Sequence, residues 1–239
     1  MVPTEVAAVA VVMLAGFMRG MTGFGGAMLM APSLSLLLGP VPAVVIALAL
    51  ESAAAAVMFA DALPRIQGRS VLYLTVPACL TVPIGGYFLL TLDPVLARKA
   101  IAAAVALFSL MLLTGFRYSG APRPSTSVAL SLVVGVLLGA TSVGAPPIII
   151  YLLAGGDPPS TTLVNLTVIV TAISVMGMVM LMSAGIITRE LALQAVGLTF
   201  PFLAATWVGG RMYGRMTEST VRRVALAMML SLSLVSLIL

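Results

Sequence analysis

The chain alternates long apolar runs with short polar connections. The runs lie near residues 5–18, 24–38, 41–60, 71–90, 97–113, 127–142, 145–154, 161–185, 189–208 and 221–239. A helix that crosses a bilayer needs about 20 consecutive apolar residues, and most of these runs approach that length. Short segments of alternating polarity, which would indicate a transmembrane barrel, do not stand out. The pattern therefore predicts an all-α, polytopic membrane protein.

Composition agrees with this pattern, because 61% of the 239 residues are hydrophobic and only 8% are charged. The chain has no histidine, so imidazole metal ligands and histidine general bases are excluded. One cysteine, Cys79, cannot form an internal disulfide. We therefore expect no metal and no cofactor. The net charge of +5 comes from basic residues in the connections, where membrane topology explains them better than nucleic acid does.

Five runs fall on each side of a polar, Gly- and Pro-containing stretch, which divides the chain into repeats at 1–114 and 127–239 with a loop at 115–126. Two blocks of residues recur across this loop. The first recurs after 119 positions: Gly16, Gly20, Thr22 and Gly25 match Gly135, Gly139, Thr141 and Gly144. The second recurs after 124 positions: Thr75, Pro77, Gly85, Gly86 and Arg98 match Thr199, Pro201, Gly209, Gly210 and Arg222.

The distribution of basic residues favours inverted over parallel repeats, since cytoplasmic loops retain Lys and Arg. An inverted arrangement puts eight on one side, which are Arg65, Arg69, Arg117, Arg123, Arg211, Arg215, Arg222 and Arg223, and leaves Arg98, Lys99 and Arg189 opposite. A parallel arrangement gives five against six. Inversion requires an odd number of crossings per half, and residues 5–38 form either a re-entrant hairpin or two crossings. Both termini then face outside.

Two glycine-rich stretches predict breaks in membrane helices: "TGFGG" at Thr22–Gly26 and "TSVGAPP" at Thr141–Pro147. Irregular backbone at membrane depth survives only where it lines a cavity or is buried in protein. A helix that restarts there aims free N–H groups and a positive dipole end at the cavity, which suits an anion. Paired breaks in inverted repeats are typical of secondary transporters. The outer glycines, Gly16, Gly20, Gly135 and Gly139, are better explained as helix-packing residues.

The stretches "AGFMRGMTGFGGAMLMAPSL" and "GATSVGAPPIIIYLLAGGDPPSTTLVN" resemble the two signatures of the TauE/SafE sulfite exporter family, also called TSUP. The resemblance covers nearly the whole chain. It implies a bacterial inner-membrane carrier of sulfite, thiosulfate, sulfonates or related small organic anions. Many relatives have a small residue at the position of Arg19 and a glycine at that of Ala145, which leaves a substrate other than sulfite open.

Two charged residues stand out at membrane depth. Arg19 follows an apolar run, and its guanidinium matches sulfonate, sulfite or carboxylate oxygens; contact with substrate, pairing with Glu51 and an interfacial anchor remain alternatives. Glu51 lies within the run 41–60 and is either a proton-coupling site or the partner that neutralises Arg19. Asn165 is a candidate neutral counterpart of Glu51. The candidate substrate-binding residues are Arg19, Thr22, Gly23, Gly25, Gly26, Thr141, Ser142, Gly144 and Asn165.

The sequence thus predicts a secondary transporter of small anions that works by alternating access in a lipid bilayer. An anion channel is the main alternative. An intramembrane hydrolase is disfavoured, because the chain has no histidine for a Ser–His dyad and no aspartate pair at membrane depth. Without a Walker-type motif, we expect no ATP binding. Substrate, direction, coupling ion and oligomeric state stay open.

Overall fold

A computed structural model describes residues 2–62, 70–116, 118, 120, 123–156, 158–212 and 218–238. Within these residues the regular structure is helical. The elements are α1 (Val2–Thr22), α2 (Gly26–Leu38), α3 (Pro40–Ala62), α4 (Ser70–Thr91), α5 (Pro94–Leu113), α6 (Pro124–Thr141), α7 (Ala145–Leu152), the 3₁₀ helix η2 (Leu153–Gly155), α8 (Pro159–Ser183), α9 (Arg189–Met212) and α10 (Glu218–Ile238).

Local sequence signals set several helix starts. Proline occupies the first helical position of α5 and α6, where its missing N–H costs no hydrogen bond. At α5 the carboxylate of Asp93 also caps the helix, accepting from the N–H groups of Val95 at 2.9 Å and Leu96 at 3.4 Å. These starts follow the run boundaries of the sequence to within a few residues.

Seven helices are long and apolar enough to cross a membrane: α1, α3, α4, α5, α6, α8 and α9. By contrast, α2 has 13 residues, or about 20 Å, which is less than the hydrocarbon thickness of about 30 Å. The helix α7 is shorter still, with 8 residues. The chain is therefore a polytopic helical membrane protein with one short helix after each predicted break.

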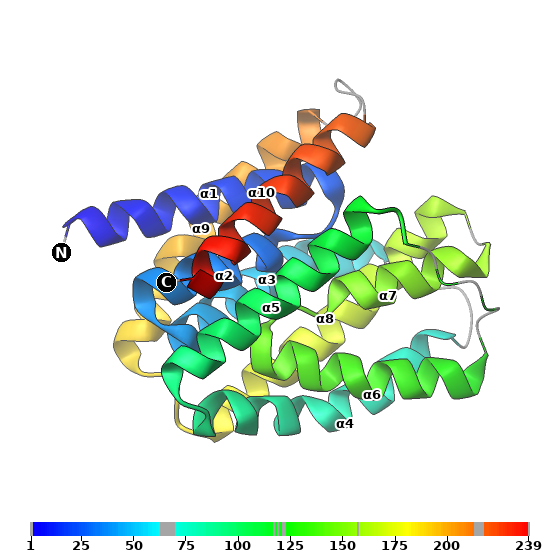
Figure 1. Ribbon diagram of the computed structural model, residues 1–239, viewed down its shortest axis with the longest axis horizontal. Coiled ribbons are helices and arrows are strands. Elements are labelled where there is room, and N and C mark those ends of the chain that lie inside the picture. Colours follow the sequence, from blue (N-terminus) through cyan, green and yellow to red (C-terminus); the bar gives the residue numbers. More distant parts are fainter. Residues whose placement is uncertain are drawn as a thin grey trace.

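The two halves are inverted relative to each other. In Figure 1, α1 runs from left to right whereas its counterpart α6 runs from right to left, and both termini lie on the left. Likewise α5 and α10 run in opposite directions. The inverted-repeat prediction is confirmed, while the limits 1–114 and 127–239 remain a prediction.

The basic connections distribute as the inverted arrangement requires. The start of α6, preceded by Arg123, and the end of α9, which carries Arg211, lie to the right in Figure 1. The starts of α5, with Arg98, and of α9, with Arg189, lie to the left. Of the other basic residues used for topology, Arg65, Arg69, Arg117 and Arg215 lie outside the described residues.

Glycines bring helices of opposite halves into close backbone contact, α1 against α9 and α6 against α4. A methyl group added at any of the four would overlap a carbonyl oxygen of the facing helix: Gly16 faces Phe202, Gly20 faces Thr206, Gly135 faces Ala78 and Gly139 faces Val82. The two pairs of contacts are related by the offsets of 119 and 124. The four glycines are thus packing residues, as predicted.

Residues 5–38 form a re-entrant hairpin rather than two crossings. Arg19 near the end of α1 and Ala27 at the start of α2 both contact Glu51, the twelfth of 23 residues in α3. The turn of the hairpin therefore lies at the depth of the middle of α3. From there the short α2 returns to the side on which α3 begins, because only Gly39 separates the two helices.

Candidate functional site

A threonine ends the long helix at the first break. The hydroxyl of Thr22 donates a hydrogen bond to the carbonyl oxygen of Met18 at 2.8 Å and accepts one from the N–H of Phe24 at 3.4 Å. It thereby replaces partners that the backbone loses where α1 stops. Thr22 therefore stabilises the break through hydrogen bonds between its hydroxyl and the neighbouring backbone.

The second break repeats this arrangement. The hydroxyl of Thr141 donates to the carbonyl oxygen of Leu137 at 2.6 Å and accepts from the N–H of Val143 at 3.2 Å. Each of these residues lies 119 positions after its counterpart in the first break. Two segments of different sequence therefore form the same two hydrogen bonds, although their backbones differ before the short helices, with φ 93° at Gly25 and −120° at Gly144.

Positive φ angles follow both threonines. Gly23 has φ 77° and Ser142, its counterpart, has φ 59°, so the chain turns in the left-handed region at both places. Gly25 follows at φ 93°, directly before α2. Glycine tolerates this conformation without steric cost, whereas Ser142 adopts it with its hydroxyl bonded to the Thr141 carbonyl oxygen at 2.6 Å.

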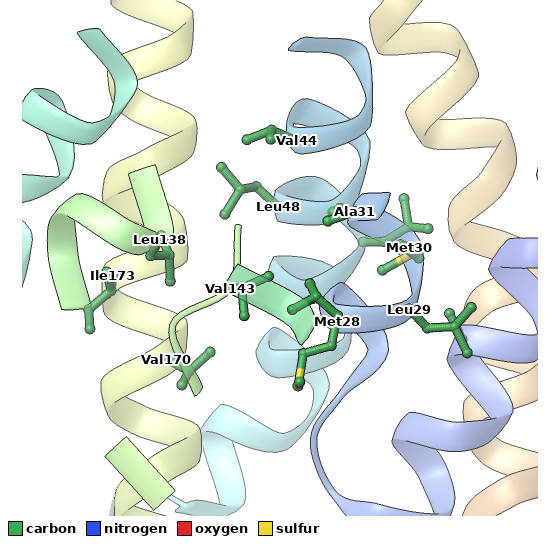
Figure 2. Close-up of a cluster of buried hydrophobic side chains, with 14 of the residues drawn as sticks. Met28, Leu29, Met30, Ala31, Val44, Leu48, Leu138, Val143, Val170 and Ile173 are labelled. Atoms are coloured by element: carbon green, nitrogen blue, oxygen red, sulfur yellow. The ribbon is translucent and has the colours of Figure 1, made fainter. Parts of the chain in front are cut away.

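The two breaks meet at a small cavity with a volume of about 20 Å³, which is room for one water molecule. Gly25, Ala27 and Met28 line it from the first half, and residues 142–146 line it from the second. The N-terminal ends of α2 and α7 therefore both border the cavity. Figure 2 shows Met28 and Val143, which come from opposite halves, in the same buried cluster.

Arg19 and Glu51 form a buried ion pair at this cavity. Both line it, and they are only 7% and 5% exposed. One oxygen of Glu51, Oε1, also accepts the N–H of Ala27 at 2.9 Å, at the first turn of α2. The Nε–H of Arg19 has no hydrogen-bond partner among the described residues. The Glu51 carboxylate is thus bound by the Arg19 guanidinium and the Ala27 N–H. The Nε–H of Arg19 remains available as a donor.

Gly26 makes room for this carboxylate. A methyl group added there would lie 2.5 Å from Glu51 Oε1 and 3.4 Å from the Cβ of Arg19. The corresponding residue of the second half is Ala145, which has that methyl group. Gly26 therefore serves the ion pair and does not line the cavity.

A scan against protein-family models matches the model of the sulfite exporter TauE/SafE over residues 8–236. The chain belongs to the TauE/SafE family. The resemblance inferred from the two glycine-rich signatures is confirmed, and at the level of the family it makes the chain a membrane exporter of sulfite or related anions. No curated protein and no solved structure gives a significant match.

This TauE/SafE chain brings only some of the predicted binding residues to the cavity, namely Arg19, Gly25, Ser142 and Gly144, together with Glu51. Thr22 and Thr141 hold the breaks, and Gly23 is an exposed turn residue. Asn165 is buried in α8 and is not among the residues that line this cavity. A role of Asn165 in binding stays a prediction.

Sequence reasoning missed eight of the residues that line the cavity of the TauE/SafE chain: Ala27, Met28, Leu138, Val143, Ala145, Pro146, Val170 and Ser174. Leu138 and Val170 line the cavity from the second half. They lie 119 positions after Arg19 and Glu51, so the offset that related the glycines would have found them. Sequence reasoning placed the counterpart of Glu51 at Asn165 instead. At these two positions the first half is charged and the second is apolar, while the second half also contributes Ser142 and Ser174 to the cavity.

Two aromatic residues, Tyr151 and Trp207, make packing and interface contacts away from the cavity. Tyr151 is buried, and its hydroxyl contacts the hydroxyl of Ser127 at 2.8 Å, which ties α7 to the start of α6. The exposed ring of Trp207 lies 3.7 Å below the guanidinium carbon of Arg211, an arrangement typical of a membrane–water interface.

Proposed function

We propose that the chain is a secondary carrier of small anions, working by alternating access between its two inverted halves in a bacterial inner membrane. The observation that carries the proposal is the buried Arg19, held at a cavity where the N-terminal ends of two short helices meet. The proposed substrates are sulfite, thiosulfate, sulfonates or related organic anions, in keeping with the family.

Three sets of donors suit an anion here. Arg19 supplies a planar guanidinium that binds two oxygens at once, and its Nε–H is free to donate. The first turn of α2 supplies the N–H of Ala27, which already binds a carboxylate oxygen. The start of α7 adds the positive end of a second helix dipole next to Gly144.

Glu51 acts in this proposal as an internal anion that the substrate replaces. A substrate anion that binds Arg19 takes the cation away from the carboxylate, which lies within the protein at membrane depth. A buried carboxylate without a cationic partner is strongly destabilised, so it takes up a proton instead. Anion and proton therefore bind together, and each raises the affinity for the other.

The close glycine contacts suggest which helices move together during alternating access. The pairs α1–α9 and α4–α6 each combine helices of both halves through close backbone packing, so we treat each pair as a rigid unit. The helices α3 and α8 pack against each other and carry Glu51 and Val170 at the cavity. A rocking of one unit against the other would open the cavity first to one side of the membrane and then to the other.

The test is uptake of labelled sulfite or ethanesulfonate into proteoliposomes, with and without a pH gradient. A carrier saturates and shows counterflow, whereas a channel passes the anion only down its gradient. We expect Glu51→Gln, which mimics the protonated carboxyl, to bind anion at least as well as the wild type while losing its response to the gradient. The control is Glu190→Gln, an exposed carboxylate on α9, with wild-type behaviour.

Arg19→Lys tests the anion seat in the same vesicles. Lysine keeps the charge but not the planar fork, so we expect affinity to fall at least tenfold. Arg189→Lys, at the exposed start of α9, is the matched control. Unchanged affinity in Arg19→Lys and Arg19→Ala would remove Arg19 from the site. A Glu51→Gln variant that still responds to the gradient would make Glu51 a structural partner of Arg19 only.

A further inference from the structure

The cavity between the two breaks offers different chemistry to the two ends of a bound molecule. Arg19 and Glu51 line it from the first half, and the corresponding positions of the second half are Leu138 and Val170. Both apolar side chains are buried, Leu138 at 1% exposure and Val170 at 9%. Figure 2 shows the two among buried apolar side chains, together with Met28 and Val143.

The charges present limit the charge of the ligand. Among the described residues that line the cavity, Arg19 is the one cation and Glu51 the one anion. A monoanion that pairs with Arg19 while Glu51 takes a proton leaves the site neutral. A dianion in the same place leaves an uncompensated buried charge, which is costly.

The polar groups present limit how many oxygens can be satisfied on the second side. Apart from backbone, that side offers the hydroxyls of Ser142 and Ser174, and Ser142 already donates to the carbonyl oxygen of Thr141 at 2.6 Å. A tetrahedral oxyanion with oxygens on every side, such as sulfate, would place some of them against Leu138 and Val170. Oxygens buried without a hydrogen bond lose the free energy of their hydration.

We infer that Leu138 and Val170 are specificity-determining residues that select a monoanion carrying a short apolar group. The sulfonate or carboxylate head binds Arg19 and the start of α2, and the apolar group packs against Leu138 and Val170. This inference rests on the proposed anion transport. It adds that inorganic dianions such as sulfite and thiosulfate, which carry a second negative charge and no apolar group, are the poorer ligands of this chain. The cavity of about 20 Å³ must widen to admit any of them.

The first experiment measures binding of methane-, ethane- and propanesulfonate to the purified full chain, beside sulfite and thiosulfate. Each methylene that becomes buried is expected to raise affinity about fourfold, until the pocket is full. Sulfite and thiosulfate are expected to bind more weakly than ethanesulfonate.

Two conservative variants assign the effect to the apolar side. Val170→Thr keeps the shape but adds a hydroxyl, and we expect it to weaken ethanesulfonate binding about tenfold while leaving sulfite binding equal or tighter. Leu138→Ala enlarges the pocket and should shift the optimum to a longer chain. Val179→Thr on α8 and Leu132→Ala on α6 are the controls, because both residues are exposed on the outer surface.

The outcomes separate this inference from the proposed function. If sulfite binds as tightly as ethanesulfonate, or if Val170→Thr weakens both equally, the apolar side does not select the ligand. Loss of binding in Arg19→Ala would still support the anion site in that case. If none of the five anions binds in a manner that depends on Arg19, both the inference and the proposed function are wrong.

Discussion

The break after Thr22 and the break after Thr141 have the same hydrogen bonds at positions 119 residues apart, but they present different side chains to the cavity. The first carries Arg19 and is paired with Glu51 of α3. The second has Leu138 and Val170 at these positions. The backbone of a re-entrant break is therefore a shared solution to ending a helix at membrane depth, while the charges are confined to one copy.

This difference assigns separate tasks to the repeated and the unrepeated residues. Residues that recur, such as the two threonines and the packing glycines, satisfy backbone groups and let helices approach, which both halves need. Arg19 and Glu51 do not recur. A buried ion pair is not an efficient source of stability, because its desolvation offsets most of the attraction. A single copy of the pair is thus better explained by function than by folding.

The largest expected effect comes from converting the first site into the second. Arg19→Leu leaves Glu51 buried without its cation, and we expect a loss of about 3–5 kcal/mol in stability. The double variant Arg19→Leu/Glu51→Val copies the residues of the second half and should recover most of that loss without recovering anion binding. Thermal unfolding in detergent and a binding assay measure both. A double variant as unstable as the single one would contradict the comparison.

Substitution of the packing glycines that both halves share should lower stability by the same amount in each half. Gly20→Ala and Gly139→Ala each push a methyl group into a carbonyl oxygen of the facing helix, that of Thr206 or Val82. We expect each to cost about 3 kcal/mol through overpacking, seen as a lower yield of monodisperse protein and a lower unfolding temperature. Gly197→Ala is the control, because no atom lies within 4 Å of the added methyl group. Tolerance of one variant alone would show that the two interfaces are not equivalent.

Most of the fold could be predicted from the sequence, because it depends on signals that repeat. Run lengths near 20 residues indicate spanning helices, and the basic residues indicate inversion. The packing role of Gly16 and Gly135 followed from their spacing alone. The hairpin at residues 5–38 stayed undecided, since a run of 15 residues fits either a short crossing or a helix that turns back, and only its contact with the middle of α3 decides this.

The site was harder to predict, because sequence does not show which side of a helix faces the cavity. Arg19 and Glu51 stood out as charges in apolar runs, and they do form a pair. Leu138 and Val170 are two apolar residues among many, and only the repeat offset of 119 from Arg19 and Glu51 points to them. A binding role of Gly26 stays a prediction, and nothing in the sequence indicates that this glycine lies against an oxygen of Glu51 from a different helix.

A smaller loss of stability is expected from exchanging glycine and alanine at Gly26 and its counterpart Ala145, and it should differ between the two positions. Gly26→Ala places a methyl group 2.5 Å from Glu51 Oε1, so the carboxylate must leave the N–H of Ala27. A hydrogen bond to a charged group contributes about 1.5–3 kcal/mol, and we expect Gly26→Ala to lower the free energy of unfolding by about 2 kcal/mol. In the Glu51→Val background the same change should be neutral. Ala145→Gly should cost less than about 1 kcal/mol in either background. Equal losses of stability in both backgrounds would mean that the cost of Gly26→Ala does not depend on Glu51.

The smallest effects concern the threonines that end the long helices. Thr22→Val and Thr141→Val each remove the hydroxyl at the C-terminal end of a helix, and a hydrogen bond of this kind contributes about 1 kcal/mol. We expect the larger loss at Thr141, because its hydroxyl is buried and accepts at 3.2 Å, whereas that of Thr22 is partly exposed and accepts at 3.4 Å. Thr167→Val is the control, because Thr167 is partly buried in α8 and its hydroxyl donates to the Leu163 carbonyl oxygen of the same helix at 2.8 Å. Since the two hydroxyls share no partner, the double variant should show the sum of the two losses in thermal unfolding, to within about 0.5 kcal/mol. A larger combined loss would mean that the breaks support each other across the cavity, and the two halves could then not be treated as independent copies of one turn.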